Sequence, residues 1–127
     1  MIENIWIGNF NLKEFASKDG AESPYPHVVQ DCLIDLLNDI RTDFGKPVIV
    51  NSAYRSEEHN EAVGGVKNSF HTQGLAADIR PRKQSDLDDL YHSACKHNPD
   101  GGVGRYDTFV HVDCRGYAAR WDYRSKE

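Results

Sequence analysis

Two histidines and one aspartate stand out because of their residue types and their sequence surroundings. Asp78 lies between Ala77 and Ile79 in an apolar stretch, where a carboxylate is unfavourable unless a positive group meets it. His71 lies in a polar connection just before that stretch, and His111 lies inside a valine-rich one. Two imidazoles and a carboxylate can hold zinc with a fourth position open, and they also suit Fe(II). The alternative is an Asp–His ion pair in the core beside an unrelated histidine.

Three helices are expected along the chain. The clearest covers residues 28–44, where apolar residues recur at three- and four-residue steps. A short helix is expected at about residues 56–63, and a third helix at about 86–97. Ser85, with Asp88 three residues later, resembles a capping arrangement at the start of this third helix.

Short strands alternate with these helices. Residues 47–52 are rich in β-branched side chains and residues 76–80 form a second apolar run, so both are read as strands. Residues 101–114 are typical of a hairpin, and the alternation of side chains puts His111 and Asp113 on one face of its second strand. The elements follow no βαβ rhythm. They predict an α+β fold with a small, mostly antiparallel sheet and flanking helices.

The composition fits one soluble domain. The chain has 127 residues, a formal net charge of −5 and 28% charged residues, so we expect residues 1–127 to form a single domain. No stretch approaches the roughly 20 apolar residues of a spanning helix, which argues against membrane insertion. The first residues carry no visible secretory signal. A pI near 5.6 argues against nucleic acid as the main partner.

The three cysteines are too widely spaced for a disulfide framework or a CxxC site. They are Cys32, Cys95 and Cys114. We expect all three to be small buried residues, which fits synthesis in a reducing cytosol.

A family resemblance rests on the run Ser69-x-His71-x-x-Gly74-x-Ala76-x-Asp78. It resembles the signature of the zinc D-alanyl-D-alanine carboxypeptidase family, which includes vancomycin-resistance D,D-dipeptidases and phage endolysins and shares its fold with the hedgehog signalling domain. Residues 52–65 and 102–113 are also similar to one branch, so the resemblance spans about residues 47–121. Trp121, at its end, is expected in the core or in a pocket wall.

The resemblance implies a role for each matched residue. His71, Asp78 and His111 would be the zinc ligands. Arg55 would face the scissile carbonyl and the developing oxyanion, and its plainer alternative is an ion pair. Ser69 would lie near the substrate and the metal, and its plainer alternative is a hydroxyl that bonds its own turn.

The general base is where the sequence departs from the family. Many members have Glu or Asp three residues before the last histidine ligand, where this chain has Thr108. Asp113 follows that histidine by two residues and should share its face, whereas Asp107 lies at the expected hairpin tip. We favour Asp113 as the base. Its carboxylate could instead hydrogen-bond the metal ligand His111 and orient it, or it could bond Arg115 or Arg120.

The function that the resemblance implies is a zinc metallopeptidase that hydrolyses peptidoglycan stem peptides or cross-links. It would act as a D-Ala-D-Ala carboxypeptidase or as an endolysin-type endopeptidase. The alternative is a catalytically weak or inactive zinc-bearing module of phage origin with a binding or structural role. We expect cytoplasmic synthesis without a signal peptide and release to the cell wall as a phage-type lysin. The sequence leaves the oligomeric state open, with a monomer as the expectation.

Overall fold

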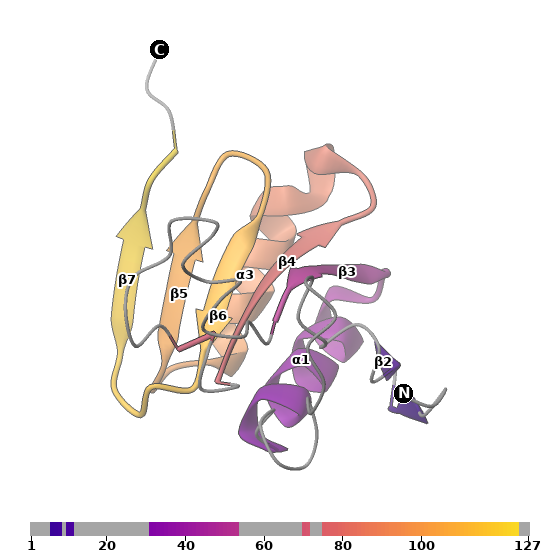
Figure 1. Ribbon diagram of the computed structural model, residues 1–127. Coiled ribbons are helices and arrows are strands. Elements are labelled where there is room, and N and C mark those ends of the chain that lie inside the picture. The colour runs from indigo at the N-terminus through magenta and orange to yellow at the C-terminus, as the bar shows by residue number, and fades with distance from the viewer. Residues whose placement is uncertain (1–5, 9, 12–30, 54–69, 72–74, 125–127) are drawn as a thin grey trace.

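The main feature of the fold is a five-stranded sheet in the order β3-β4-β6-β5-β7 (Figure 1). The computed structural model describes residues 6–8, 10–11, 31–53, 70–71 and 75–124. The strands of the sheet are β3 (Val48–Ser52), β4 (Ala76–Pro81), β5 (Gly102–Arg105), β6 (Val110–Asp113) and β7 (Ala119–Asp122). Neighbours pair antiparallel, except that β7 runs parallel to β5. The expected α+β class is therefore confirmed.

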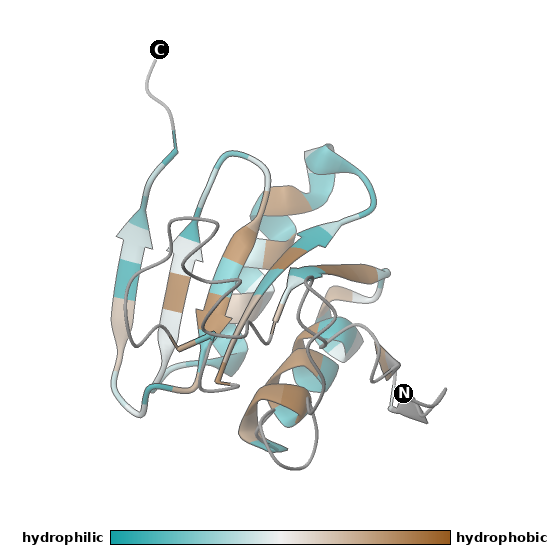
Figure 2. Cartoon of the chain, viewed as in Figure 1, coloured by the Kyte–Doolittle hydropathy of each residue, from teal (hydrophilic) through white to brown (hydrophobic). Residues whose placement is uncertain are grey.

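Within the described residues, two α-helices pack against one face of this sheet. They are α1 (Asp31–Phe44) and α3 (Leu87–His97), and a short 3-10 helix, η2 (Gln84–Asp86), leads into α3. Hydrophobic and hydrophilic residues lie on different sides of α1 (Figure 2), and burying such an apolar stripe drives the packing. A separate small sheet pairs β1 (Trp6–Ile7) with β2 (Phe10–Asn11).

The core lies between the helices and one face of the sheet, because side chains alternate along each strand. Ile79 of β4 and Val103 of β5 belong to the same buried cluster as Leu37 of α1 and Leu90 of α3. Each such side chain contributes roughly 1.5–3 kcal/mol when fully buried. Residues that alternate with these, such as Asp78, lie on the opposite face of the sheet. That face carries the candidate site.

The structure confirms two of the expected helices and corrects how the helix expected at 86–97 begins. The helix expected at 28–44 is present as α1, and the helix expected at 56–63 lies outside the described residues. The capping arrangement expected at Ser85 is wrong, because the chain enters α3 through η2 with no side-chain cap bond. Asp88 is used elsewhere: its carboxylate accepts two hydrogen bonds from Arg105 of β5.

All four expected strands are present, but the sequence predicted neither the short strands β1 and β2 nor β7. Only alternate residues of β7 are partly buried, and its exposed positions are Arg120 and Asp122. Such a short strand, with no run of β-branched residues, carries little signal of its own. It forms because β5 offers an unpaired edge, to which Ala119 N–H and Tyr123 N–H donate hydrogen bonds from either end of β7.

The expectation of three buried cysteines is wrong for Cys32. Cys32 is exposed, because the first turn of α1 directs Leu33 and Ile34 into the core instead. Cys95 and Cys114 are half-buried and pack against the core cluster. Among the described residues, no helix is long and apolar enough to span a bilayer.

Candidate metal centre

The strand register places Asp78 and His111 side by side on the face opposite the core. Asp78 of β4 pairs with His111 of β6, and His111 pairs with Gly104 of β5. The same row continues to Trp121 of β7. On the other side, a bulge in β3 brings Ser52 opposite Asp78. Bulges re-aim side chains in this way, so one row of five residues crosses the whole sheet.

Asp78 stands between the two histidines, with one carboxylate oxygen toward each ring. Its Oδ1 lies 3.0 Å from His111 Nδ1, and its Oδ2 lies 3.4 Å from His71 Nε2. One ligand atom from each of the three residues lies within 4.8 Å of the others. A tetrahedral zinc ion with bonds of about 2.1 Å holds its ligand atoms roughly 3.4 Å apart. The three residues are therefore suited to hold zinc. His71 and His111 face the same carboxylate, that of Asp78.

The other nitrogen of each imidazole is held by an acceptor outside this group. His71 Nδ1 lies 2.7 Å from the backbone oxygen of Ala53, just after β3. His111 Nε2 lies 2.8 Å from Asp113 Oδ2. With a proton on each of these outer nitrogens, both inner nitrogens keep a lone pair for a metal. Metal-binding histidines are oriented in this way by carbonyl and carboxylate partners.

The electrostatics keep Asp78 charged. Burial raises the pKa of Asp78, but the neighbouring His111 and His71 rings outweigh it and hold that pKa well below its usual range. For His111, burial lowers the pKa, while hydrogen bonds to Asp113 and Asp78 outweigh it and raise the pKa. A buried anionic carboxylate between two imidazoles is a suitable binding group for a divalent cation.

Asp113 contacts His111 on the side away from Asp78, and both of its carboxylate oxygens accept hydrogen bonds from protein donors. Its carboxylate is fully buried and accepts hydrogen bonds at 2.8 Å from Arg115 Nε and Nη2, and at 3.1 Å from the Gly102 N–H. Burial raises the pKa of Asp113, but Arg115 and His111 outweigh it and keep that pKa well below its usual range. These contacts match the supporting role left open for Asp113, with Arg115 as its partner. Arg120 instead donates to the backbone oxygens of residues 98 and 101.

The remaining predicted residues are less closely tied to this group. Asp107 is exposed in the turn between β5 and β6, beyond the last pair of the hairpin ladder. Thr108, beside it, is also exposed. Arg55 and Ser69 lie outside the described residues.

Two glycines of β5 make room for the site, a feature that the sequence analysis did not use. A Cβ atom at Gly104 would clash with the indole of Trp121, and a Cβ at Gly102 would lie 2.5 Å from Asp113 Oδ2. Both positions face the site because Val103 between them faces the core. The alternation Gly-Val-Gly beside a strand with His and Asp two residues apart is the signal that could have indicated this.

Aromatic and cationic side chains border the site on the β7 side. The Trp121 ring lies 5.3 Å from the His111 ring, and its Nε1–H donates to Tyr106 Oη at 2.9 Å. The Arg115 guanidinium lies 4.9 Å from the centre of the Phe70 ring and 5.0 Å from that of Trp121. Trp121 is half-buried beside a candidate ligand, so it forms a wall of the site rather than part of the core.

Comparison with known proteins agrees with this geometry. No curated protein matched the chain. The profile of the family described as Peptidase M15 matches residues 5–113, which include all three candidate ligands and Asp113. β7, with Trp121, follows the matched range. A profile that covers most of the chain, together with His71, Asp78 and His111 converging on one face of the sheet, shows that this chain belongs to the zinc D-alanyl-D-alanine carboxypeptidase-like M15 peptidase family.

Proposed function

We propose that this protein is a zinc metallopeptidase that hydrolyses peptidoglycan, at stem peptides or at cross-links. The observation that carries the proposal is the convergence of His71, Asp78 and His111, with one ligand atom of each within 4.8 Å of the others, in a chain of a peptidase family. The peptidoglycan substrate and release to the cell wall as a phage-type lysin are the parts of the proposal that rest on the sequence resemblance.

The residues divide the work between holding the metal and positioning its ligands. A zinc ion bound by the three ligands supplies a Lewis acid and an activated water near neutral pH. Asp78 provides the negative charge, and Ala53 O and Asp113 fix the two imidazole rings. Arg55 is proposed to face the developing oxyanion, where loss of one such donor costs about 10²–10³ in rate.

The proton acceptor is the open role in this scheme. A base must reach the attacking water within hydrogen-bonding distance. Asp113 was favoured from the sequence, but its contacts with His111 and Arg115 suit a positioning residue. Asp107 remains the second candidate, from an exposed position in the turn.

The proposal is tested by metal content and by digestion of purified peptidoglycan. We expect about one zinc per chain and release of free amino groups, with both lost in His71→Ala. His92→Ala is the matched control, because His92 is an exposed histidine on α3 and its loss should change neither quantity. Absence of zinc after supplementation would contradict the metal site.

Two further substitutions separate the enzyme from the alternative binding module. Asp107→Asn and Asp113→Asn are each compared with the parent for zinc content and turnover. In an enzyme, one of the two substitutions abolishes amino-group release from an active parent. A parent that binds zinc but releases no amino groups from any peptidoglycan type would instead be a binding or structural module.

A further inference from the structure

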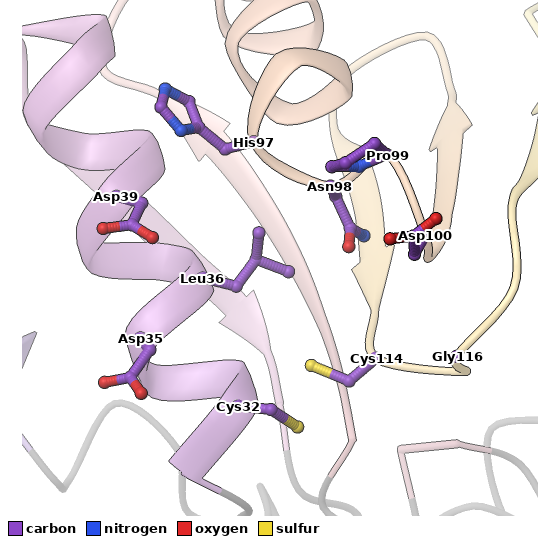
Figure 3. Close-up of a pocket in the computed structure, with 10 residues that line it drawn as sticks. All are labelled: Cys32, Asp35, Leu36, Asp39, His97, Asn98, Pro99, Asp100, Cys114 and Gly116. Atoms are coloured by element: carbon purple, nitrogen blue, oxygen red, sulfur yellow. The ribbon is translucent and has the colours of Figure 1, made fainter.

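Two of the three cysteines meet in a groove, although 81 residues separate them in the sequence. Cys32 lies in the first turn of α1, and Cys114 directly follows β6. Both line a groove whose other walls include the end of α3 (Figure 3). In Figure 3 both side chains lie at the same end of this groove, Cys32 on α1 and Cys114 on the opposite wall.

The two thiols differ in their exposure to solvent, which decides which of them a dissolved reagent can reach first. Cys32 is exposed, so a dissolved reagent can reach it, whereas Cys114 is half-buried. Burial raises the pKa of the Cys114 thiol, and so does the neighbouring Cys32 thiol. The case that the two thiols can react with each other rests on their shared position in the groove.

We propose that Cys32 and Cys114 form an intramolecular disulfide when the protein meets a low-molecular-weight disulfide such as oxidised glutathione. The inference stands apart from the proposed peptidase function, because it uses none of the metal ligands. It also departs from the sequence expectation, in which widely spaced cysteines indicated no disulfide.

The reaction balances as two successive thiol–disulfide exchanges. The exposed Cys32 thiolate attacks one sulfur of oxidised glutathione, which releases one reduced glutathione and leaves a mixed disulfide at Cys32. Cys114 then loses its proton, and its sulfur attacks the Cys32 sulfur, releasing the second glutathione. The two cysteine thiols give up two electrons and two protons, and oxidised glutathione is reduced to two thiols.

The bond would link the first helix to the strand that carries a candidate ligand. The loop closed between Cys32 and Cys114 contains His71, Asp78 and His111. The Cys114 N–H also donates to Leu75 O at 3.0 Å, next to the start of β4. The bond would stay open in a reducing cytosol and close in an oxidising compartment, where disulfides persist.

The test exposes the purified, full-length chain to oxidised glutathione and then counts free thiols. We expect loss of two of the three thiols, a mass decrease of two hydrogens, and a linked peptide that joins Cys32 to Cys114. Closing so long a loop should raise the melting temperature by about 10 °C, and a reducing agent should reverse the rise. Cys95→Ser is the matched control, because it keeps the pair and should keep the whole response.

Cys32→Ser changes an exposed side chain and should therefore fold like the parent while losing the temperature rise. Three outcomes would overturn the proposal in the parent chain: three free thiols after treatment, a stable glutathione adduct at Cys32, or a disulfide between two molecules. Zinc content and peptidoglycan digestion are separate readouts, so failure of the disulfide is distinguishable from failure of the peptidase proposal.

Discussion

Asp113 has no exposed surface, and its two oxygens are shared among His111, Arg115 and the Gly102 N–H. This arrangement predicts that Asp113→Asn weakens zinc binding by about 10- to 100-fold, because the His111 ring loses its charged partner. Competition against a chromophoric chelator measures the affinity. Asp107→Asn is the control and should bind zinc like the parent. Equal affinities in both variants would show that Asp113 does not position His111.

The second prediction at this scale concerns the space above Gly104. A Cβ there would meet the Trp121 indole, so Gly104→Ala should lower the free energy of unfolding by about 1–3 kcal/mol. Urea unfolding measures this change. Trp121→Ala removes the clashing ring, so in that background the same alanine should cost much less. Purely additive effects would contradict the proposed contact.

The sequence was most informative about residues whose type conflicts with their surroundings. Asp78 was singled out because a carboxylate within an apolar strand needs a positive partner, and the family resemblance then named His71 and His111 as its co-ligands. The role of Asp113 was harder to predict, because it depends on the hydrogen bonds that Arg115 donates to its carboxylate. The sequence does not fix the direction of the Arg115 side chain. Trp121 could not be assigned without knowing that β7 joins the sheet.

At the scale of elements, α1 and α3 are tied together by a carboxylate at the end of α1. Asp43 accepts hydrogen bonds from Ser93 Oγ at 2.8 Å and from Lys96 Nζ at 3.2 Å, both on α3. These bonds lower the pKa of Asp43 below its ordinary value of 3.8. A lowered pKa means that the charged form stabilises the folded state. This stabilisation is complete above the ordinary pKa and is lost as the pH falls toward the lowered one.

We therefore expect Asp43→Asn to lower the urea midpoint at pH 7, with the difference from the parent shrinking as the pH falls below about 4. Parallel urea titrations at pH 7, 5 and 3 provide the measurement. Asp39→Asn, at an exposed position on the same helix, controls for loss of an acidic charge and should change the midpoint little. A deficit that persisted unchanged at pH 3 would argue against the carboxylate.

Elements with strong periodic patterns were predictable, and those that depend on a partner were not. α1 follows from its hydrophobic spacing, and β3, β4 and β6 follow from their runs of apolar and β-branched residues. β7 instead follows from the open edge of β5, which is a property of the assembled sheet. The capping arrangement expected for α3 was wrong because Asp88 bonds Arg105, a contact across the fold.

At the scale of the whole molecule, the candidate ligands come from β4, β6 and the segment before β4, so a bound metal would link distant parts of the chain. A metal that binds only the folded state stabilises it by about 2.7 kcal/mol at 100 times its dissociation constant. We expect a rise of several degrees in melting temperature when zinc is added to chelator-treated protein. Scanning calorimetry measures it, and His71→Ala should show no rise. The same melting temperature with zinc and with chelator would contradict the site.

The position of β7 at the border of the sheet has a consequence for solubility. Without it, β5 would present a row of open N–H and C=O groups, to which a strand of another molecule could add. β7 occupies that row and places the charged residues Arg120 and Asp122 at exposed positions of the new border. Charges at such a border discourage the stacking of molecules into fibrils. The strand that supplies the tryptophan wall thus also covers the edge of β5.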